Sequence, residues 1–240
     1  MIEVKFKEKT LRDQIAIIKD FLSDINDMSI VIADYFGVDI YQDIQSKDSD
    51  IEEKVTRLYN ERKPEFEKSI NHFQQLWDSK SKFINRELTK VFGKEFTFEC
   101  DAYINLNPVW PRYLDTHSFD VNIDADDNFL LASATHEICH FIWFSIWKEN
   151  FPNCSRECYD YPHLEWLISE IVVEPIFKFS NLKELSITPA YDYFYTDSVN
   201  GETVVDIANR IYSESENISD FQYKIYDYFI SFSHSSLAIK

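Results

Sequence analysis

Apolar and polar positions follow a helical period over much of the chain. Apolar residues recur every three or four positions in three early stretches, residues 10–28, 48–59 and 64–92. We expect an amphipathic helix in each of them, because this spacing puts the apolar side chains on one face. Thr10 and Asp13 have the spacing of a capping box at the start of the first helix. Pro64 and Gly93 are a typical start and stop for the third.

The period changes to two after Gly93. Alternating apolar and polar residues predict half-buried strands over residues 96–106 and 118–124. Helical patterns return in four later stretches, residues 127–148, 162–177, 202–212 and 219–232. A few strands among many helices predict an α+β fold. We expect a mainly helical part over residues 1–93 and a second part over 94–240, with Gly93 at the boundary.

Composition limits the classes of partner. The chain has 240 residues and a formal net charge of −18, with 42 acidic and 24 basic side chains. This balance argues against binding to nucleic acid or to an anionic membrane, since both need basic patches. Residues 1–10 lack a signal-peptide core, and no apolar run approaches the length and character of a membrane span. The four cysteines are too few and too irregularly spaced for a disulfide framework. We therefore expect a cytoplasmic protein.

The segment with the clearest chemistry is His136-Glu137-Ile-Cys-His140, which lies in the helix expected over residues 127–148. At about 100° per residue, the two histidines stand roughly 40° apart on one helix face and Glu137 lies at its flank. Two metal ligands and a general base would then come from one rigid element. Cys139 points about 60° away from His136 and is expected to pack in the core.

A catalytic zinc usually takes three protein ligands, so a third is needed. Glu170 and Glu174 lie in the apolar stretch of residues 162–177, which we expect to form one helix that ends or kinks at Pro175. Buried carboxylates are costly unless a metal or a hydrogen-bond donor holds them. The spacing of four residues puts both on one helix face. His163 is the alternative third ligand, which would give a three-histidine site.

The order HEICH, then SEIVVE on a later helix, resembles the gluzincin metallopeptidases, the thermolysin-like group. By this resemblance, His136, His140 and Glu170 would bind one Zn²⁺ per chain and Glu137 would be the general base. Glu174 would not bind the metal itself but would orient His136. The resemblance also implies a zincin-like fold, in which a small mixed β-sheet packs on the HExxH helix and on the glutamate-bearing helix, with helical parts at both ends of the chain.

The resemblance covers residues 129–177 and departs from the family in two places. The step from His140 to Glu170 is 30 positions (170 − 140), somewhat longer than in thermolysin-like enzymes, and an insertion within residues 150–160 would absorb it. Ser169 stands where the family often has Asn. The third histidine of a metzincin is missing, and so is the Gly-x-Met-Glu-Asn motif of the related aminopeptidases.

The resemblance implies zinc-dependent, endopeptidase-like hydrolysis of a peptide or protein substrate, in which Glu137 takes a proton from the attacking water. Zincins bind extended substrates by strand addition to a sheet edge, and the candidate edge residues are Ser118, Phe119, Asp120, Val121 and Asn122. An interior strand without a substrate role is the alternative. The candidate oxyanion donors are Tyr191, Tyr193, Tyr195, Tyr223 and His234.

Four questions stay open at this point. The chain is either such a hydrolase or a binding or regulatory module on a zincin scaffold, in which zinc is structural or absent. The amino-terminal helices are a candidate cover for the site, and the sequence does not determine the oligomeric state. Cys154 and Cys158 either form a second metal site with His163 or are free thiols in a loop, since their spacing is not that of a CxxC pair.

Overall fold

The computed structural model describes residues 1–185, 193–196, 198–199 and 201–233, and its fold is α+β. The chain forms two compact units. The first, called the sheet unit, comprises Ile2–Ser81 and Phe98–Leu130. The second, called the helical unit, comprises Met1, Lys82–Thr97 and Leu131–Lys240.

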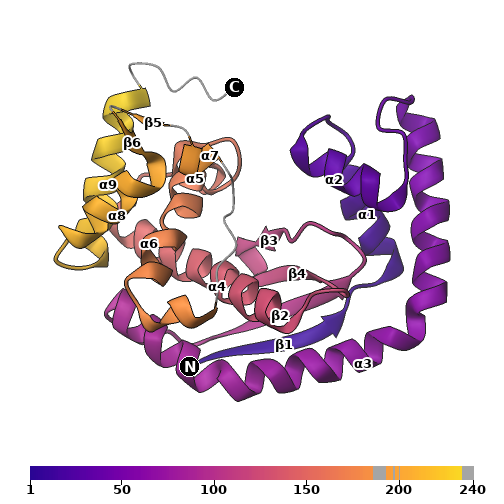
Figure 1. Ribbon diagram of the computed structural model, residues 1–240, viewed down its shortest axis with the longest axis horizontal. Helices are drawn as coiled ribbons and strands as arrows, with labels where there is room; N and C mark the ends of the chain where they lie inside the picture. The colour runs from indigo at the N-terminus through magenta and orange to yellow at the C-terminus, as the bar shows by residue number, and fades with distance from the viewer. Residues whose placement is uncertain (186–192, 197, 200, 234–240) are drawn as a thin grey trace. The chain divides into compact units, whose positions relative to one another are not determined.

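The sheet unit contains a four-stranded mixed sheet (Figure 1). Its strands are β1 (Ile2–Glu8), β2 (Phe98–Asn105), β3 (Arg112–Tyr113) and β4 (Ser118–Asn122), in the order β1-β2-β4-β3. β1 and β4 are parallel to β2, and β3 is antiparallel to β4. The two strands expected after Gly93 are thus present as β2 and β4.

Strand β1 was not predicted, although its sequence alternates. Ile2, Val4 and Phe6 are buried while Lys5 and Lys7 are exposed. Because β1 pairs with β2 along its whole length, residues before Gly93 belong to the same unit as strands after it. The compact units therefore do not divide at Gly93.

Three helices complete the sheet unit, and the third continues into the helical unit. They are α1 (Leu11–Phe21), α2 (Asp27–Phe36) and α3 (Ile44–Phe92). Thr10 caps α1 as expected. The helix expected over residues 10–28 ends early, because Asn26 forms a capping box that starts α2. Pro64 lies inside α3 instead of starting a helix, since one lost backbone hydrogen bond does not divide a 49-residue helix. Gly93 follows its end with a left-handed φ of 73°.

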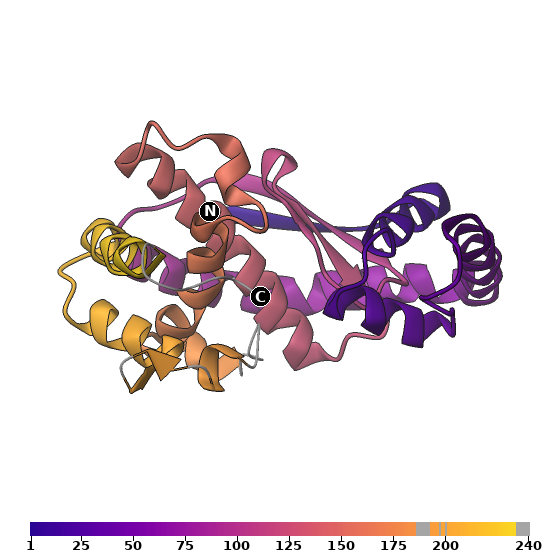
Figure 2. The same cartoon turned by 90° about the horizontal axis from the view of Figure 1, so that it is seen from above.

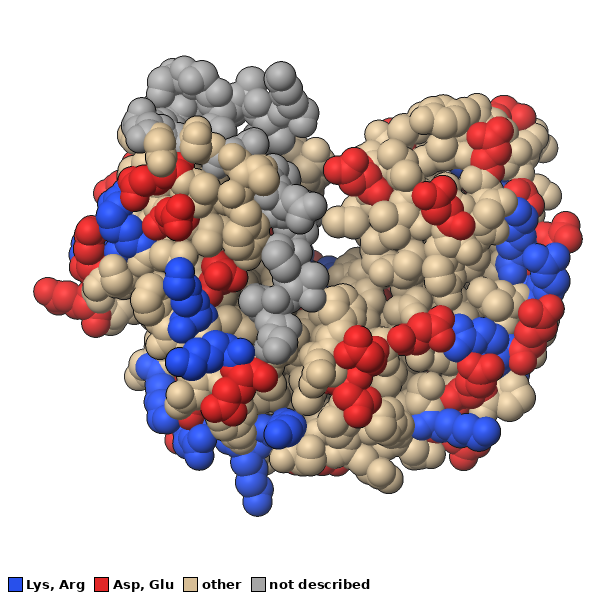
Figure 3. Space-filling model, viewed as in Figure 1, with Lys and Arg blue, Asp and Glu red and all other residues tan. Residues whose placement is uncertain are grey.

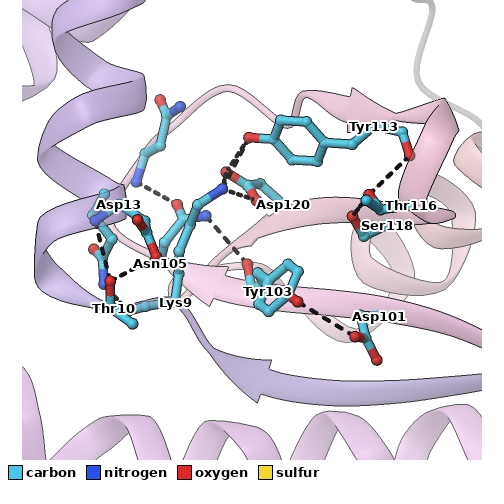
Figure 4. A network of polar contacts seen from close by, with 12 residues as sticks. Lys9, Thr10, Asp13, Asp101, Tyr103, Asn105, Tyr113, Thr116, Ser118 and Asp120 are labelled. Carbon is cyan, nitrogen blue, oxygen red and sulfur yellow. Dashed lines mark hydrogen bonds and ion pairs between the residues drawn. The ribbon is translucent and has the colours of Figure 1, made fainter.

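A buried polar network joins the end of β1 to β4 within the sheet unit (Figure 4). The Lys9 ammonium donates to both Asp120 carboxylate oxygens, at 2.6 and 2.8 Å, and to the Tyr113 hydroxyl at 2.9 Å. The Asp120 side chain is fully buried and that of Lys9 is 11% exposed. Burial of a charge without a partner is costly, so this pairing makes the position of Asp120 tolerable.

The helical unit contains most of α4 (Asp127–Asn150) and several shorter helices, and Figure 2 shows the chain from above. After α4 come η2 (Arg156–Tyr159), α5 (Leu164–Ile171), α6 (Val173–Lys178), η3 (Asn181–Leu185), α7 (Tyr193–Thr196), β5 (Ser198–Val199), β6 (Glu202–Thr203), α8 (Val204–Ser213) and α9 (Ile218–Ser233). Trp143 and Trp147 of α4 and Phe221 of α9 are fully buried in its core.

Helix α4 begins where the sequence indicates. The Asp126 carboxylate accepts hydrogen bonds from the backbone N–H groups of Asn128 and Phe129, at 3.0 and 2.9 Å, which satisfies two donors of the first turn. By length and composition α4 is apolar enough to cross a membrane, which differs from the expectation that no run approaches that character. Burial explains the composition, because 78% of its apolar window is buried within the protein.

Acidic and basic side chains are interleaved over the face drawn in Figure 3. In the sheet unit, the Arg62 guanidinium lies 2.5 Å from Asp124 and 2.7 Å from Glu65. In the helical unit, Lys94 lies 2.8 Å from Glu149. These exposed pairs contribute little to stability individually.

Candidate metal centre

Helix α4 brings His136 and His140 together on one face. Their ring centroids lie 4.6 Å apart with an angle of 68° between the planes. The His136 side chain is 13% exposed and that of His140 is fully buried. Cys139, on another face of α4, is 1% exposed, and burial raises the pKa of its thiol well above the ordinary value. It packs in the core as a neutral group, as expected.

Glu170, at the end of α5, completes the group. Its Oε2 lies 3.3 Å from Nε2 of His136 and 3.5 Å from Nε2 of His140. The three ligand atoms lie within 4.8 Å of one another. The Glu170 side chain is 7% exposed. One carboxylate oxygen therefore faces two imidazole nitrogens at nearly equal distances in a mostly buried position.

These separations fit a tetrahedral cation. Zinc bonds of about 2.0–2.1 Å at the tetrahedral angle hold neighbouring ligand atoms about 3.3–3.4 Å apart. A direct charge-assisted hydrogen bond between imidazole and carboxylate would be shorter, at about 2.7–2.9 Å. The observed 3.3 and 3.5 Å are compatible with two edges of such a tetrahedron. Two imidazoles and one carboxylate are donors that suit zinc chemically, and their spacing is compatible with a metal site.

Glu137 is the residue directly after the first histidine and is 7% exposed. Its helix position puts it at the flank of the histidine face, as the sequence indicates. Glu137 is thus a mostly buried carboxylate next in sequence to one histidine of the candidate site.

The structure replaces the expected single helix over residues 162–177 by two helices. α5 ends at Ile171 and α6 begins at Val173, with Val172 between them. Pro175 explains the break, since it has no N–H to donate to the carbonyl four residues before it. Glu174 lies in the first turn of α6, and its carboxylate accepts a hydrogen bond from the Tyr195 hydroxyl at 3.0 Å. Its role toward His136 stays a prediction.

His163 is not a member of the His136–His140–Glu170 group. It is exposed at the N-cap of α5, and Glu170 occupies the place beside the two histidines. The geometry therefore favours Glu170 as the third ligand.

The expected substrate edge is not an edge in the sheet. β4 has β2 on one side, while Ser118 and Phe119 pair with β3 on the other. The backbone N–H of Asp120 also donates to the carbonyl of Pro111 at 2.9 Å. All five candidate residues, Ser118, Phe119, Asp120, Val121 and Asn122, are buried. The interior strand, the alternative reading of this pattern, is what the pairing shows, because the short β3 takes the outer position.

The structure describes the side chains of two of the five candidate oxyanion donors, which are Tyr191, Tyr193, Tyr195, Tyr223 and His234. Tyr191 and His234 lie outside the described residues, and for Tyr193 only the backbone is described. Tyr195 is hydrogen-bonded to Glu174, as given above. Tyr223 donates to the backbone carbonyl of Asn150 at 3.1 Å. Tyr195 is thus the candidate with a contact to a predicted site residue.

A second group of ligand-type side chains lies in the same unit. Cys154, Cys158 and Glu165 each offer a ligand atom, and these atoms lie within 4.8 Å of one another. The sequence pointed to His163 as the companion of the two cysteines, whereas the structure brings Glu165 to them. The first turn of α5 explains the difference, because Glu165 follows the capping residue His163 by two positions and faces into the unit.

Comparison of the chain with protein-family models, with curated proteins and with solved structures gave no match.

Proposed function

We propose that the protein is a zinc-dependent hydrolase of peptide bonds with a zincin-like, gluzincin-type centre. The observation that carries the proposal is the position of Glu170 Oε2, 3.3 and 3.5 Å from the two histidine Nε2 atoms. The adjacent Glu137 supports it, because a purely structural zinc site has no need of a base beside its ligands.

In this proposal His136, His140 and Glu170 hold the ion. When bound, zinc supplies a Lewis acid that polarises a carbonyl and lowers the pKa of water. Glu137 takes a proton from the attacking water and passes it to the leaving amine. The low exposure of Glu137 and Glu170, 7% each, keeps bulk water from competing for these groups. The substrate is a peptide or protein, cleaved in an endopeptidase-like manner.

The second candidate function is a binding or regulatory module on the same scaffold. This function would use the same metal ligands, but Glu137 would be dispensable for it. The acidic balance of the chain, 42 acidic against 24 basic side chains, is the feature that would suit a cationic partner. Hydrolysis that is lost when Glu137 is replaced would distinguish the hydrolase from the binding module.

Two variants test the proposal in the full chain. Glu170→Ala should lose about one zinc ion per chain in elemental analysis, because a three-ligand site loses a ligand. Glu137→Gln should keep the zinc content of the wild type and lose cleavage of a peptide library. Glu184→Gln, an exposed glutamate in η3 of the same unit, is the control and should change neither.

Three results would count against the proposal. Full zinc content in Glu170→Ala would remove Glu170 from the ligand set. Cleavage by Glu137→Gln at the wild-type rate would remove its role as base. Zinc-loaded wild type that cleaves no peptide of the library would favour the binding module.

A further inference from the structure

Two cysteines lie in the segment that connects the two ligand-bearing helices. α4 ends at Asn150 and α5 begins at Leu164, and Cys154 and Cys158 lie between them. Their Sγ atoms and a carboxylate oxygen of Glu165 lie within 4.8 Å of one another. Both cysteines are half-buried, and Glu165 is 9% exposed. All of these residues belong to the helical unit.

The backbone and a neighbouring helix hold the three side chains in this arrangement. The N–H of Cys154 donates to the carbonyl of Phe151 at 3.0 Å, and the N–H of Cys158 donates to the carbonyl of Ser155 at 3.2 Å. The hydroxyl of Tyr226, from α9, donates to Glu165 Oε1 at 2.9 Å. Metal-binding carboxylates usually have a hydrogen-bond partner of this kind, which fixes their orientation.

The local charge favours a cation at this group, because the carboxylate of Glu165 lies beside the two sulfurs. The neighbouring Arg156 forms an ion pair with Asp160 at 2.7 Å, which offsets its positive charge. A cation among the sulfurs would stabilise the thiolate form of both cysteines.

We propose that Cys154, Cys158 and Glu165 form a second zinc site, with two thiolates, one carboxylate and solvent as the fourth ligand. Two sulfur ligands select a soft or borderline cation such as Zn²⁺ over Mg²⁺ or Ca²⁺, which prefer oxygen. Binding exchanges the thiol proton of each cysteine for a bond to zinc and releases both protons to solvent. No oxidation or reduction takes place.

The second site affects the position of α5. It ties the segment after α4 to the first turn of α5, and Glu170 lies five residues later on the same helix. The second ion therefore limits the movement of the helix that carries Glu170, and it does so whether or not the protein hydrolyses peptides. This site needs neither His136 nor His140.

Cobalt substitution in the full chain distinguishes the two sites. Co²⁺ bound to thiolate gives an intense near-ultraviolet charge-transfer band, whereas the His136–His140–Glu170 group has no sulfur. With Co²⁺ as the only added metal and the protein kept reduced, we expect the band in the wild type and in Glu170→Ala. It should be lost in Cys154→Ser and in Cys158→Ser. Cys100→Ala, which removes a cysteine of β2, is the matched control and should keep it.

Thiol reactivity of the reduced wild type gives a second measurement. Zn²⁺ alone should protect Cys154 and Cys158 from a thiol reagent in the reduced wild type, and a chelator should restore their reaction. Glu165→Gln should need at least about tenfold more zinc for the same protection, because it loses a charged ligand.

Several results would overturn the second site. They are a wild type without the cobalt band, a band that persists in both serine variants, and thiols that react equally with and without zinc. A band that persists in Glu170→Ala while that variant keeps its full zinc content would count against the hydrolase centre and support the cysteine site.

Discussion

The hydroxyl of Tyr195 donates a hydrogen bond to the carboxylate of Glu174 at 3.0 Å, which joins α7 to the first turn of α6. Burial and the charge of Glu174 both raise the pKa of Tyr195, so the phenol stays protonated and can act as the donor. Glu174 is the residue expected to orient His136, and Tyr195 is a candidate oxyanion donor. The pair thus links two predicted roles through one hydrogen bond.

The first prediction concerns Glu174. Glu174→Gln should weaken zinc binding about 10- to 100-fold, because a carboxylate that orients a liganding histidine contributes this much to metal affinity. Tyr195→Phe should have a smaller effect in the same direction, since Glu174 remains and only its donor is lost. Competition with a chelator of known affinity measures both. Tyr223→Phe, which loses a hydrogen bond to a backbone carbonyl, is the control. Wild-type affinity in Glu174→Gln would remove the predicted role.

The second prediction separates His163 from Glu170. His163→Ala should keep the zinc content of the wild type, because His163 is exposed at the N-cap of α5 and lies outside the group that Glu170 completes. Elemental analysis of the zinc content of His163→Ala and of Glu170→Ala makes the comparison. Loss of an ion from His163→Ala with none lost from Glu170→Ala would reverse the assignment of the third ligand.

Local patterns in the sequence predicted that His136, His140 and Glu170 would lie together, and the structure brings these three residues into one group. The HExxH spacing placed His136 and His140 on one helix face, since one helix determines their geometry. Glu170 was found because a carboxylate in an apolar helix needs a partner. What one sequence does not show is how distant segments meet. Glu165 joins Cys154 and Cys158 only through the turn before α5, and no periodicity records that turn.

The sheet shows the same limit at the level of the fold. The alternation in β2 and β4 predicted strands, but the order of strands depends on pairing between distant segments. The short β3 carries too few residues to show a period, and it takes the outer position beside β4. Apolar and polar residues alternate clearly in β1. Its place beside β2, however, depends on residues about 95 positions away, and a local pattern does not show such a pairing.

The third prediction tests the start of α1. Thr10 accepts a hydrogen bond from the backbone N–H of Asp13 at 3.2 Å and donates to its carboxylate at 2.7 Å. Thr10→Ala should lower the free energy of unfolding by about 1 kcal/mol, because the first turn loses its cap. Thr10→Ser keeps the hydroxyl and should stay close to the wild type. Urea unfolding measures both, and equal loss in the two variants would assign the effect to the lost methyl group instead.

The fourth prediction concerns pH and the buried Asp120. Burial raises the pKa of Asp120 from 3.8 to about 6, which outweighs the lowering by Lys9 and by the Tyr113 hydroxyl. A pKa that is higher in the folded than in the unfolded state means that the folded protein binds the proton more tightly. Its contribution to stability is therefore present in full below about pH 4 and is lost as the pH rises through about 6.

The difference between wild type and Asp120→Asn isolates this contribution, because other titrating groups cancel. The free energy of unfolding of the wild type, minus that of the variant, should increase by about 2–3 kcal/mol as the pH falls from about 7 to about 4. Urea unfolding across this range measures it, with the exposed Asp24→Asn as control. Asp120→Asn removes the charged partner of Lys9 and could prevent the protein from folding. In that case the double variant Lys9→Gln, Asp120→Asn replaces it in the comparison. A difference that shrinks in acid would mean that the attraction of Lys9 outweighs burial and holds Asp120 ionised.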